Sequence, residues 1–251
     1  MPFSDIAILA AAGLISGTLN AIAGGGTFFS FGALTLIGLP PIVANATSAV
    51  AMVPGYVAGA INYRKEIGAV WAGAVWLAIA SVAGSLIGAV ILIMLDNETF
   101  ADFVPWLLLA ATAVFALGPQ ISKRVPARPH KDLGHRLAAT AVQFAMSVYG
   151  GFFGAGMGIM MLASLGITEG QNFHRINALK HILSIVIQTA SIVVFVQGEV
   201  IAWPEAMVLV AAVIVGGWFG VDMARKFPIS LVRGFVIATG SALAIYYFVR
   251  S

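Results

Sequence analysis

Apolar segments of the length needed to cross a lipid bilayer recur along this chain, and they constrain its fold more than any other feature. A transmembrane helix needs about 20 predominantly apolar residues. Only 9% of the residues are charged, against about 25% in soluble domains. We therefore predict an all-α, polytopic helical membrane protein with ten apolar segments: 5–23, 26–39, 42–62, 68–95, 100–121, 137–153, 156–167, 174–197, 203–223 and 229–249.

The same composition excludes several classes of partner and chemistry. The net charge of +3 comes from a few loop lysines and arginines, so we expect no nucleic-acid partner. The chain has no cysteine, which excludes disulfides and thiolate metal sites. Its histidines lack the spacing of metal ligands, and no Gly-x-Ser-x-Gly motif is present. We expect no enzyme activity, no metal and no cofactor.

One long polar stretch, SKRVPARPHKDLGHR at 122–136, divides the chain into halves that resemble each other. Asn45 matches Asn177 (177 − 45 = 132), and GSLIG at 84–88 matches GGWFG at 216–220 with the same offset (216 − 84 = 132). Such small-xxx-small faces let membrane helices approach closely. We assign residues 1–121 to a first transmembrane repeat, 122–136 to a basic cytoplasmic linker and 137–251 to a second repeat.

Basic residues predict the orientation of the two repeats. Cytoplasmic loops of membrane proteins are enriched in lysine and arginine, and such residues fill the central stretch: Lys123, Arg124, Arg128, Lys131 and Arg136. The pair Arg225 and Lys226 then also lies inside, whereas Asp96 and Glu98 lie outside. Matching segments run in opposite directions. The pattern indicates an inverted repeat of two five-segment halves with both termini outside.

The segments 26–39 and 156–167 are too short to cross the membrane. Twelve to fourteen helical residues reach about 18–21 Å, against a hydrocarbon core of about 30 Å. Each therefore forms a broken or re-entrant helix hairpin with its predecessor, turning at NAIAGGGTFFSF (20–31) or at GAG (154–156). A half-helix starting at Thr27 would point free N–H groups at an anion. The alternative is that the glycines only allow tight helix packing.

A polar stripe follows on the segment HRINALKHILSIVIQTAS. The spacing of three, four and seven residues places six side chains on one helix face: Asn177, Lys180, His181, Ser184, Gln188 and Ser191. Placing a lysine inside the membrane costs free energy, so such a residue indicates a functional role. The alternative is that Lys180 reaches the headgroups near Arg175.

Amides, asparagines and one lysine suit a small oxyanion as substrate. No Asp or Glu lies in the middle of a predicted span, so coupling to protons would use Lys180, His181 or a proton carried by the substrate. The candidate substrate-binding residues are Asn20, Gly24, Gly25, Gly26, Thr27, Asn45, Thr47, Gly154, Gly156, Asn177, Lys180 and His181.

Two stretches carry a family resemblance: NAIAGGGTFFSFGALTLIGLPPIVANATSAVAMVPGYVAGAINYRKE and YGGFFGAGMGIMMLASLGITEGQNFHRINALKHILS. With the motifs PPxxANAT, YRxE and HRxNALK they resemble the sulfite exporter TauE/SafE family of membrane permeases over nearly the whole chain. The resemblance implies a multi-pass carrier in the bacterial inner membrane for sulfite, sulfonates such as sulfoacetate, or related anions. The motif residues are Gly24, Gly25, Gly26, Asn45, Thr47, Gly154, Gly156, Asn177 and Lys180.

The working hypothesis is a secondary transporter that works by alternating access, with the two hairpin tips meeting near the midplane. Its partners would be the anion, the lipid bilayer and, as candidate coupling ion, the proton; a homo-oligomer is compatible with the sequence. An anion channel and a non-transporting membrane scaffold are the alternatives. The identity of the anion, the direction of transport and the choice between eight and ten full spans stay open.

Overall fold

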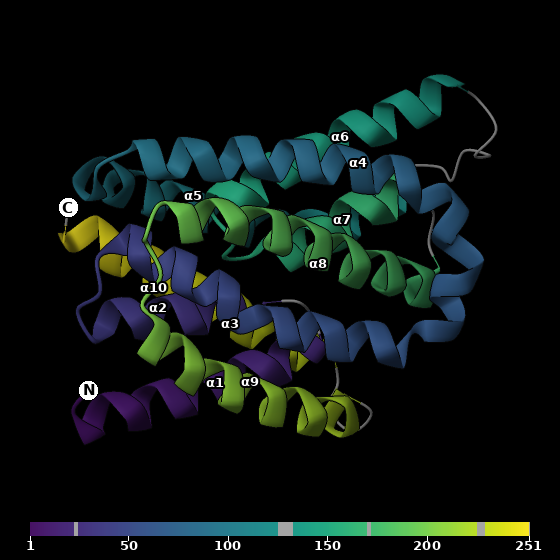
Figure 1. Cartoon of the computed structure of the whole chain (residues 1–251). Helices are drawn as coiled ribbons and strands as arrows, with labels where there is room; N and C mark the ends of the chain where they lie inside the picture. Colours follow the sequence, from purple (N-terminus) through teal and green to yellow (C-terminus); the bar gives the residue numbers. More distant parts are fainter. Residues whose placement is uncertain (23–24, 125–132, 170–171, 225–228, 251) are drawn as a thin grey trace.

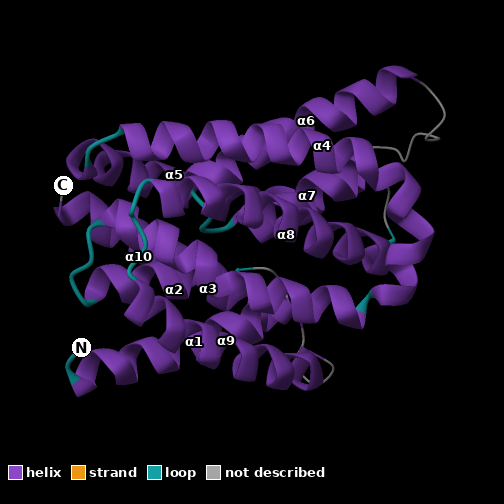
Figure 2. Ribbon diagram, viewed as in Figure 1, coloured by secondary structure: helices purple, strands orange, loops and turns teal. Residues whose placement is uncertain are grey.

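The computed structural model describes residues 1–22, 25–124, 133–169, 172–224 and 229–250. Helices joined by short loops make up these ranges, which contain no strand (Figure 2). The helices in Figure 1 are α1 (Phe3–Ile22), α2 (Thr27–Leu36), α3 (Pro41–Asn62), α4 (Arg64–Met94), α5 (Asn97–Arg124), α6 (Leu133–Phe152), α7 (Met157–Thr168), α8 (Phe173–Gln197), α9 (Trp203–Ala224) and α10 (Ile229–Arg250). Each predicted apolar segment corresponds to one helix, and the predicted all-α fold is confirmed.

Two helices extend well beyond the apolar segments that predicted them. α4 begins at Arg64 rather than at 68, and α5 continues to Arg124. With 31 residues, α4 is about 46 Å long at 1.5 Å per residue, which exceeds the hydrocarbon thickness of about 30 Å. Their polar ends therefore continue the helix outside the apolar layer, where hydropathy no longer marks it.

Four helices contain stretches long and apolar enough to cross a membrane within the described residues: Phe3–Ala21, Pro41–Asn62, Ala74–Met94 and His174–Gln197. α2 and α7 have only 10 and 12 residues. At 1.5 Å per residue they reach about 15 and 18 Å, so neither crosses the bilayer alone. The prediction that these two segments are half-length helices is confirmed.

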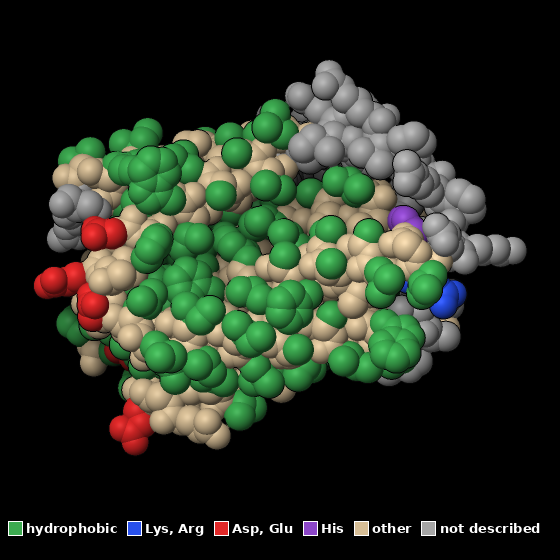
Figure 3. Space-filling model, turned by 90° about the horizontal axis from the view of Figure 1, so that it is seen from above, with side chains coloured by type: hydrophobic (Ala, Val, Ile, Leu, Met, Phe, Trp, Pro, Cys, Tyr) green, Lys and Arg blue, Asp and Glu red, His purple; other side chains and the backbone are tan. Residues whose placement is uncertain are grey.

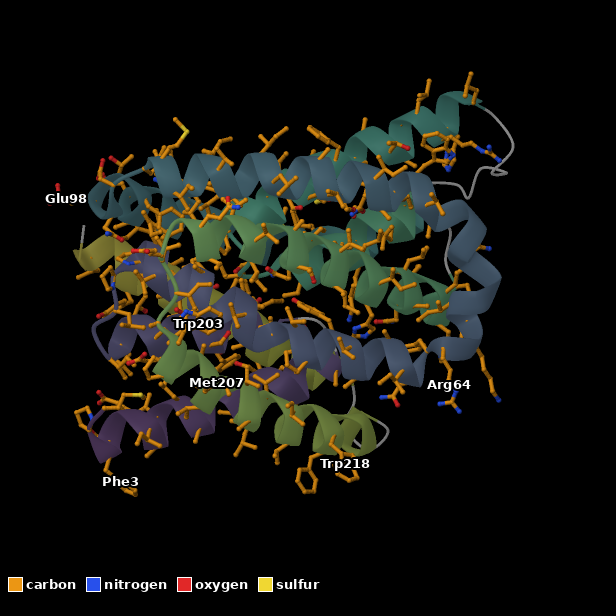
Figure 4. The ribbon with its side chains drawn as sticks, viewed as in Figure 1. Phe3, Arg64, Glu98, Trp203, Met207 and Trp218 are labelled. Atoms are coloured by element: carbon orange, nitrogen blue, oxygen red, sulfur yellow. The ribbon has the colours of Figure 1, made fainter. Side chains whose placement is uncertain are left out.

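The surface between the two ends of the molecule is apolar, as lipid contact requires. Trp76 and Trp218 are 67% and 80% exposed, and Figure 3 shows hydrophobic side chains spread over the face in view. Figure 4 places Phe3 and Trp218 on the outside of the helix assembly. A soluble domain would rarely leave such extensive apolar surface in water. The chain is a multi-pass membrane protein.

Charged side chains gather at the two ends. Acidic groups lie at one end of the face in Figure 3, and lysine and arginine side chains lie at the other. Both termini lie at the end where Glu98 is found (Figures 1 and 4). Because cytoplasmic ends of membrane proteins are rich in lysine and arginine, we still predict that both termini are external. Arg128, Lys131, Arg225 and Lys226 lie outside the described residues.

The helices form two bundles, each of which draws on both halves of the sequence (Figure 1). The α1 bundle contains α1, α2, α3, α9 and α10, and the α4 bundle contains α4 to α8. The most extensive helix contacts within them join α1 to α9 and α4 to α6; the two bundles meet mainly where α3 packs on α8 and α5 on α10. α3 and α8 occupy equivalent places in the two halves, as do α5 and α10, and the contact of α1 with α9 is the counterpart of that of α6 with α4. A two-fold relation between the halves would produce this pattern. The inverted repeat itself stays a prediction.

Glycines allow the close helix crossings inside each bundle. A Cβ atom at Gly84 of α4 would lie 2.6 Å from the Phe144 carbonyl oxygen of α6, and one at Gly88 would meet the backbone of Val148. A Cβ at Gly216 of α9 would meet the Leu14 backbone of α1. The prediction that GSLIG and GGWFG form close-packing faces is confirmed for these three glycines.

We predict that Gly84→Ala destabilises the protein, since its methyl group would overlap the α6 backbone. Overpacking of this kind costs roughly 1–3 kcal/mol, so the midpoint of thermal unfolding in detergent should fall by several degrees. Gly68→Ala on the same helix is the matched control, because nothing lies within 4 Å of a Cβ there. An equal decrease for both variants would contradict this role of the crossing.

Candidate functional site

The two glycine-containing turns meet inside the protein, where the α1 bundle contacts the α4 bundle. The first turn joins α1 to α2, and the second joins α6 to α7. The Gly156 amide donates a 2.8 Å hydrogen bond to the hydroxyl of Thr27, the first residue of α2. Gly156 itself directly precedes α7. Two helix N-termini, each with a partial positive charge, are therefore close together in the interior.

Asn45 of α3 holds the second turn in place. Its side-chain amide donates to the Phe152 carbonyl oxygen at 3.1 Å, and its side-chain oxygen accepts from the Gly154 amide at 3.2 Å. Backbone groups inside a membrane protein need such partners, because hydrocarbon offers none. A side chain of the α1 bundle thus satisfies the non-helical backbone of the α4 bundle.

The glycines in the two turns serve different purposes. Gly156 has φ +79°, a left-handed conformation that glycine adopts most easily. Gly26 has a helical φ of −62°, and a Cβ there would overlap the Ser16 carbonyl of α1. A Cβ at Gly25 would meet the side chains of Val236 and Ile159. Tight packing therefore explains Gly25 and Gly26, whereas the turn conformation explains Gly156; Gly24 lies outside the described residues.

The polar stripe of α8 faces the interior along its whole length. All six members are at most 1% exposed: Asn177, Lys180, His181, Ser184, Gln188 and Ser191. The Lys180 ammonium group has no hydrogen-bond partner among the described residues. Lys180 is 0% exposed, so the alternative in which it reaches the headgroup region is wrong.

His181 packs against two tyrosine rings, one within α3 and one directly after its last residue. Its ring stacks on Tyr63 with a centroid distance of 5.8 Å and lies 6.3 Å from the ring of Tyr56. A Cβ at Gly59 would overlap the imidazole, so this glycine makes room for it. Tyr63 directly precedes Arg64 (Figure 4), which places His181 toward the basic end of the protein.

Thr47 and Asn20 complete the predicted set. The Thr47 hydroxyl accepts a 3.0 Å hydrogen bond from the Ala202 amide, so it supports the connection between α8 and α9. Asn20 is fully buried in α1, and its side-chain atoms have no partner in the part of the chain that is described. Direct hydrogen bonds bring Thr27, Asn45 and the second turn together. Substrate binding by the predicted residues stays a prediction.

Two buried polar residues lie outside the predicted substrate-binding set, although one of them, Gln188, belongs to the predicted polar stripe. Tyr56 and Gln188 are both 0% exposed, and the Gln188 amide nitrogen lies 3.1 Å from the position of a Cβ at Gly154. They occupy equivalent positions in the two halves (188 − 56 = 132). The repeat offset could have paired them, but a tyrosine on an apolar helix is usually interpreted as packing.

We predict that Asn45→Ala lowers the stability of the protein, because it leaves the Phe152 carbonyl and the Gly154 amide without partners in a buried site. Each unsatisfied group costs about 1–3 kcal/mol, so the thermal unfolding midpoint in detergent should fall clearly. Asn62→Ala, at an exposed position on the same helix, is the control and should leave the midpoint unchanged. Equal midpoints for both variants would argue against this role for Asn45.

The similarity to known proteins extends over nearly the whole chain. The model of the family described as "Sulfite exporter TauE/SafE" matches residues 9–247. A probable membrane transporter protein of Haemophilus influenzae is 25% identical over 236 residues, which is 92% of this chain and 90% of that protein. Probable membrane transporter proteins of a Sinorhizobium species and of Escherichia coli K12 are 21% and 22% identical; the matches cover 98% and 92% of this chain and 93% and 85% of theirs. With its paired turns and apolar surface, the chain belongs to the sulfite exporter TauE/SafE family of membrane transporters.

Proposed function

We propose that the protein is a secondary carrier that moves a small sulfur-containing oxyanion, such as sulfite or a sulfonate, across the bacterial inner membrane by alternating access. The name of the family supports this substrate class. The observation that carries the proposal is the hydrogen bond between Gly156 and Thr27, because it brings two helix N-termini together inside the protein. Helix N-termini favour anions through their N–H groups and their dipole.

Lys180 supplies the countercharge in this proposal. Its side chain is fully buried without a hydrogen-bond partner among the described residues, and every described Asp or Glu side chain is at least partly exposed. Burying an unpaired charge is costly. An incoming anion would offset that cost, so Lys180 favours loading of the carrier with its substrate.

The moving units we propose are the α1 bundle and the α4 bundle. A rocking motion of one sequence half against the other would break the glycine crossings of α1 with α9 and of α4 with α6. Motion between the bundles leaves those crossings intact and changes the contacts of α3 with α8 and of α5 with α10. Both turns lie at this junction, so the motion would expose the site to each side in turn.

We predict that Lys180→Met strongly lowers the rate of saturable sulfite uptake into liposomes that contain the purified protein. Losing a buried partner of a charged ligand costs about 2–5 kcal/mol, which lowers the rate at subsaturating sulfite at least about tenfold. Excess sulfoacetate, thiosulfate and sulfate as competitors would rank the substrates, and a pH gradient would test coupling to protons.

Lys65→Met is the matched control, since Lys65 is exposed at the start of α4, and its uptake should equal that of the wild type. Thermal unfolding of both variants distinguishes a transport defect from misfolding. Because methionine removes a buried ammonium group that has no partner among the described residues, Lys180→Met should unfold no earlier than the wild type. Wild-type uptake by Lys180→Met would refute the role of this lysine. No uptake of any tested anion by the wild type would refute the proposed substrate class.

A further inference from the structure

Three uncharged polar side chains, on α1, α3 and α8, are buried without a hydrogen-bond partner among the described residues. Asn20, Tyr56 and Gln188 are all 0% exposed. The amide nitrogen and oxygen of both Asn20 and Gln188, and the hydroxyl of Tyr56, have no hydrogen-bond partner among the described residues. A buried polar group without a partner costs about 1–3 kcal/mol. Three of them in one region are therefore a substantial cost to stability, which a structural role does not explain.

These side chains come from both bundles, and Gln188 lies against the second turn. The Gln188 amide lies near the Tyr56 hydroxyl but does not reach hydrogen-bond geometry. Its nitrogen is directed at the second turn, 3.1 Å from the Cβ position of Gly154. The Asn20 amide nitrogen is 3.6 Å from the Cβ position of Gly55, which adjoins Tyr56.

The geometry of the helices explains why Tyr56 and Gln188 meet. α3 and α8 run in opposite directions where the bundles join (Figure 1). Side chains on a helix lean toward its N-terminus. Because the two helices are antiparallel, the long side chains of Tyr56 and Gln188 lean in opposite directions, toward each other. Since the two residues are repeat equivalents (188 − 56 = 132), they lie where an axis relating the halves would pass.

The buried charge on the same face of α8 limits what the protein can bind. Lys180 and Gln188 both belong to the polar stripe of α8, eight residues apart, which is about 12 Å along the helix axis. Lys180 is the only fully buried lysine or arginine among the side chains that the structure describes. Asn20, Tyr56 and Gln188 add hydrogen bonds but no charge. One buried cation can balance one negative charge, whereas a second negative charge would remain uncompensated in a medium of low dielectric constant.

We propose that Asn20, Tyr56 and Gln188 form an uncharged hydrogen-bonding station for the transported anion, and that the site selects singly charged anions over dianions. This inference rests on the proposed carrier function and specifies its substrate class. Hydrogen sulfite and simple sulfonates such as methanesulfonate carry one charge, whereas sulfate carries two and sulfoacetate, with its additional carboxylate, also carries two at neutral pH. The amide groups and the hydroxyl would donate to the oxygen atoms of the anion, and the amide oxygens would accept from a protonated oxygen.

The test measures binding rather than transport. Purified protein in detergent is titrated with sodium methanesulfonate or sodium sulfate at constant ionic strength, and the thermal unfolding midpoint is followed. A ligand that binds only the folded state raises this midpoint. We expect methanesulfonate to raise it and sulfate at the same millimolar concentrations to leave it unchanged.

Tyr56→Phe is the variant that best distinguishes a binding role from a structural role. It removes a buried hydroxyl that has no hydrogen-bond partner among the described residues, so the midpoint without ligand should rise. The affinity for methanesulfonate should fall about tenfold, because one hydrogen bond to an anion is lost. Ser191→Ala on α8 is the matched control. The hydroxyl of Ser191 donates to the Ile187 carbonyl in its own helix, and we expect this variant to bind methanesulfonate with wild-type affinity.

The outcomes separate this station from the proposed function. Equal stabilisation by sulfate would overturn the selection for one charge, and unchanged affinity in Tyr56→Phe would overturn the station; the carrier proposal would stand in both cases if liposome uptake persists. A lower midpoint of ligand-free Tyr56→Phe would show that its hydroxyl is structural, which also overturns the station. Absence of both anion binding and uptake would reject the carrier function itself.

Discussion

The need to satisfy non-helical backbone inside a membrane governs this structure. Hydrocarbon offers no hydrogen-bond partners, so a chain that breaks two helices in its interior must supply them from its own side chains. Asn45 bonds to both Phe152 and Gly154, and Thr27 bonds to Gly156. In each case a residue of the α1 bundle satisfies a turn of the α4 bundle. The turns are stable because the bundles meet there, and the proposed site lies at the same junction.

This arrangement links packing to transport. Glycines at the helix crossings, such as Gly84 of α4 against α6 and Gly216 of α9 against α1, make each bundle a tightly packed unit. The helices α3 and α8, which join the bundles, instead carry the buried polar side chains of Tyr56 and Gln188. Close-packed interiors tend to shift as units rather than deform continuously. A protein with two tightly packed bundles and a polar junction is suited to a conformational change in which the junction opens alternately to the two sides of the membrane. This is the basis of the proposed mechanism.

Much of the fold could be predicted from the sequence, because hydrophobic length and helix spacing are local properties. The segments, the short helices after the turns and the buried stripe from Asn177 to Ser191 all followed from them. The composition of the bundles, each built from helices of both halves, could not be predicted, since no local pattern indicates that α1 packs on α9. The different purposes of Gly26 and Gly156 depend on backbone angles and neighbours. The comparison of the two halves did not identify Tyr56, because the equivalent residue in the second half, Gln188, is of a different type.

The central claim is that one site serves both sides of the membrane in turn, and counterflow tests it most directly. Liposomes containing the protein are loaded with unlabelled sulfite, diluted into a trace of labelled sulfite, and compared with empty liposomes. A carrier with a single alternating site exchanges internal for external anion, so the account predicts a transient accumulation of label above equilibrium only in the loaded vesicles. Label that merely equilibrates at the same rate in loaded and empty vesicles would indicate an open channel and contradict the account.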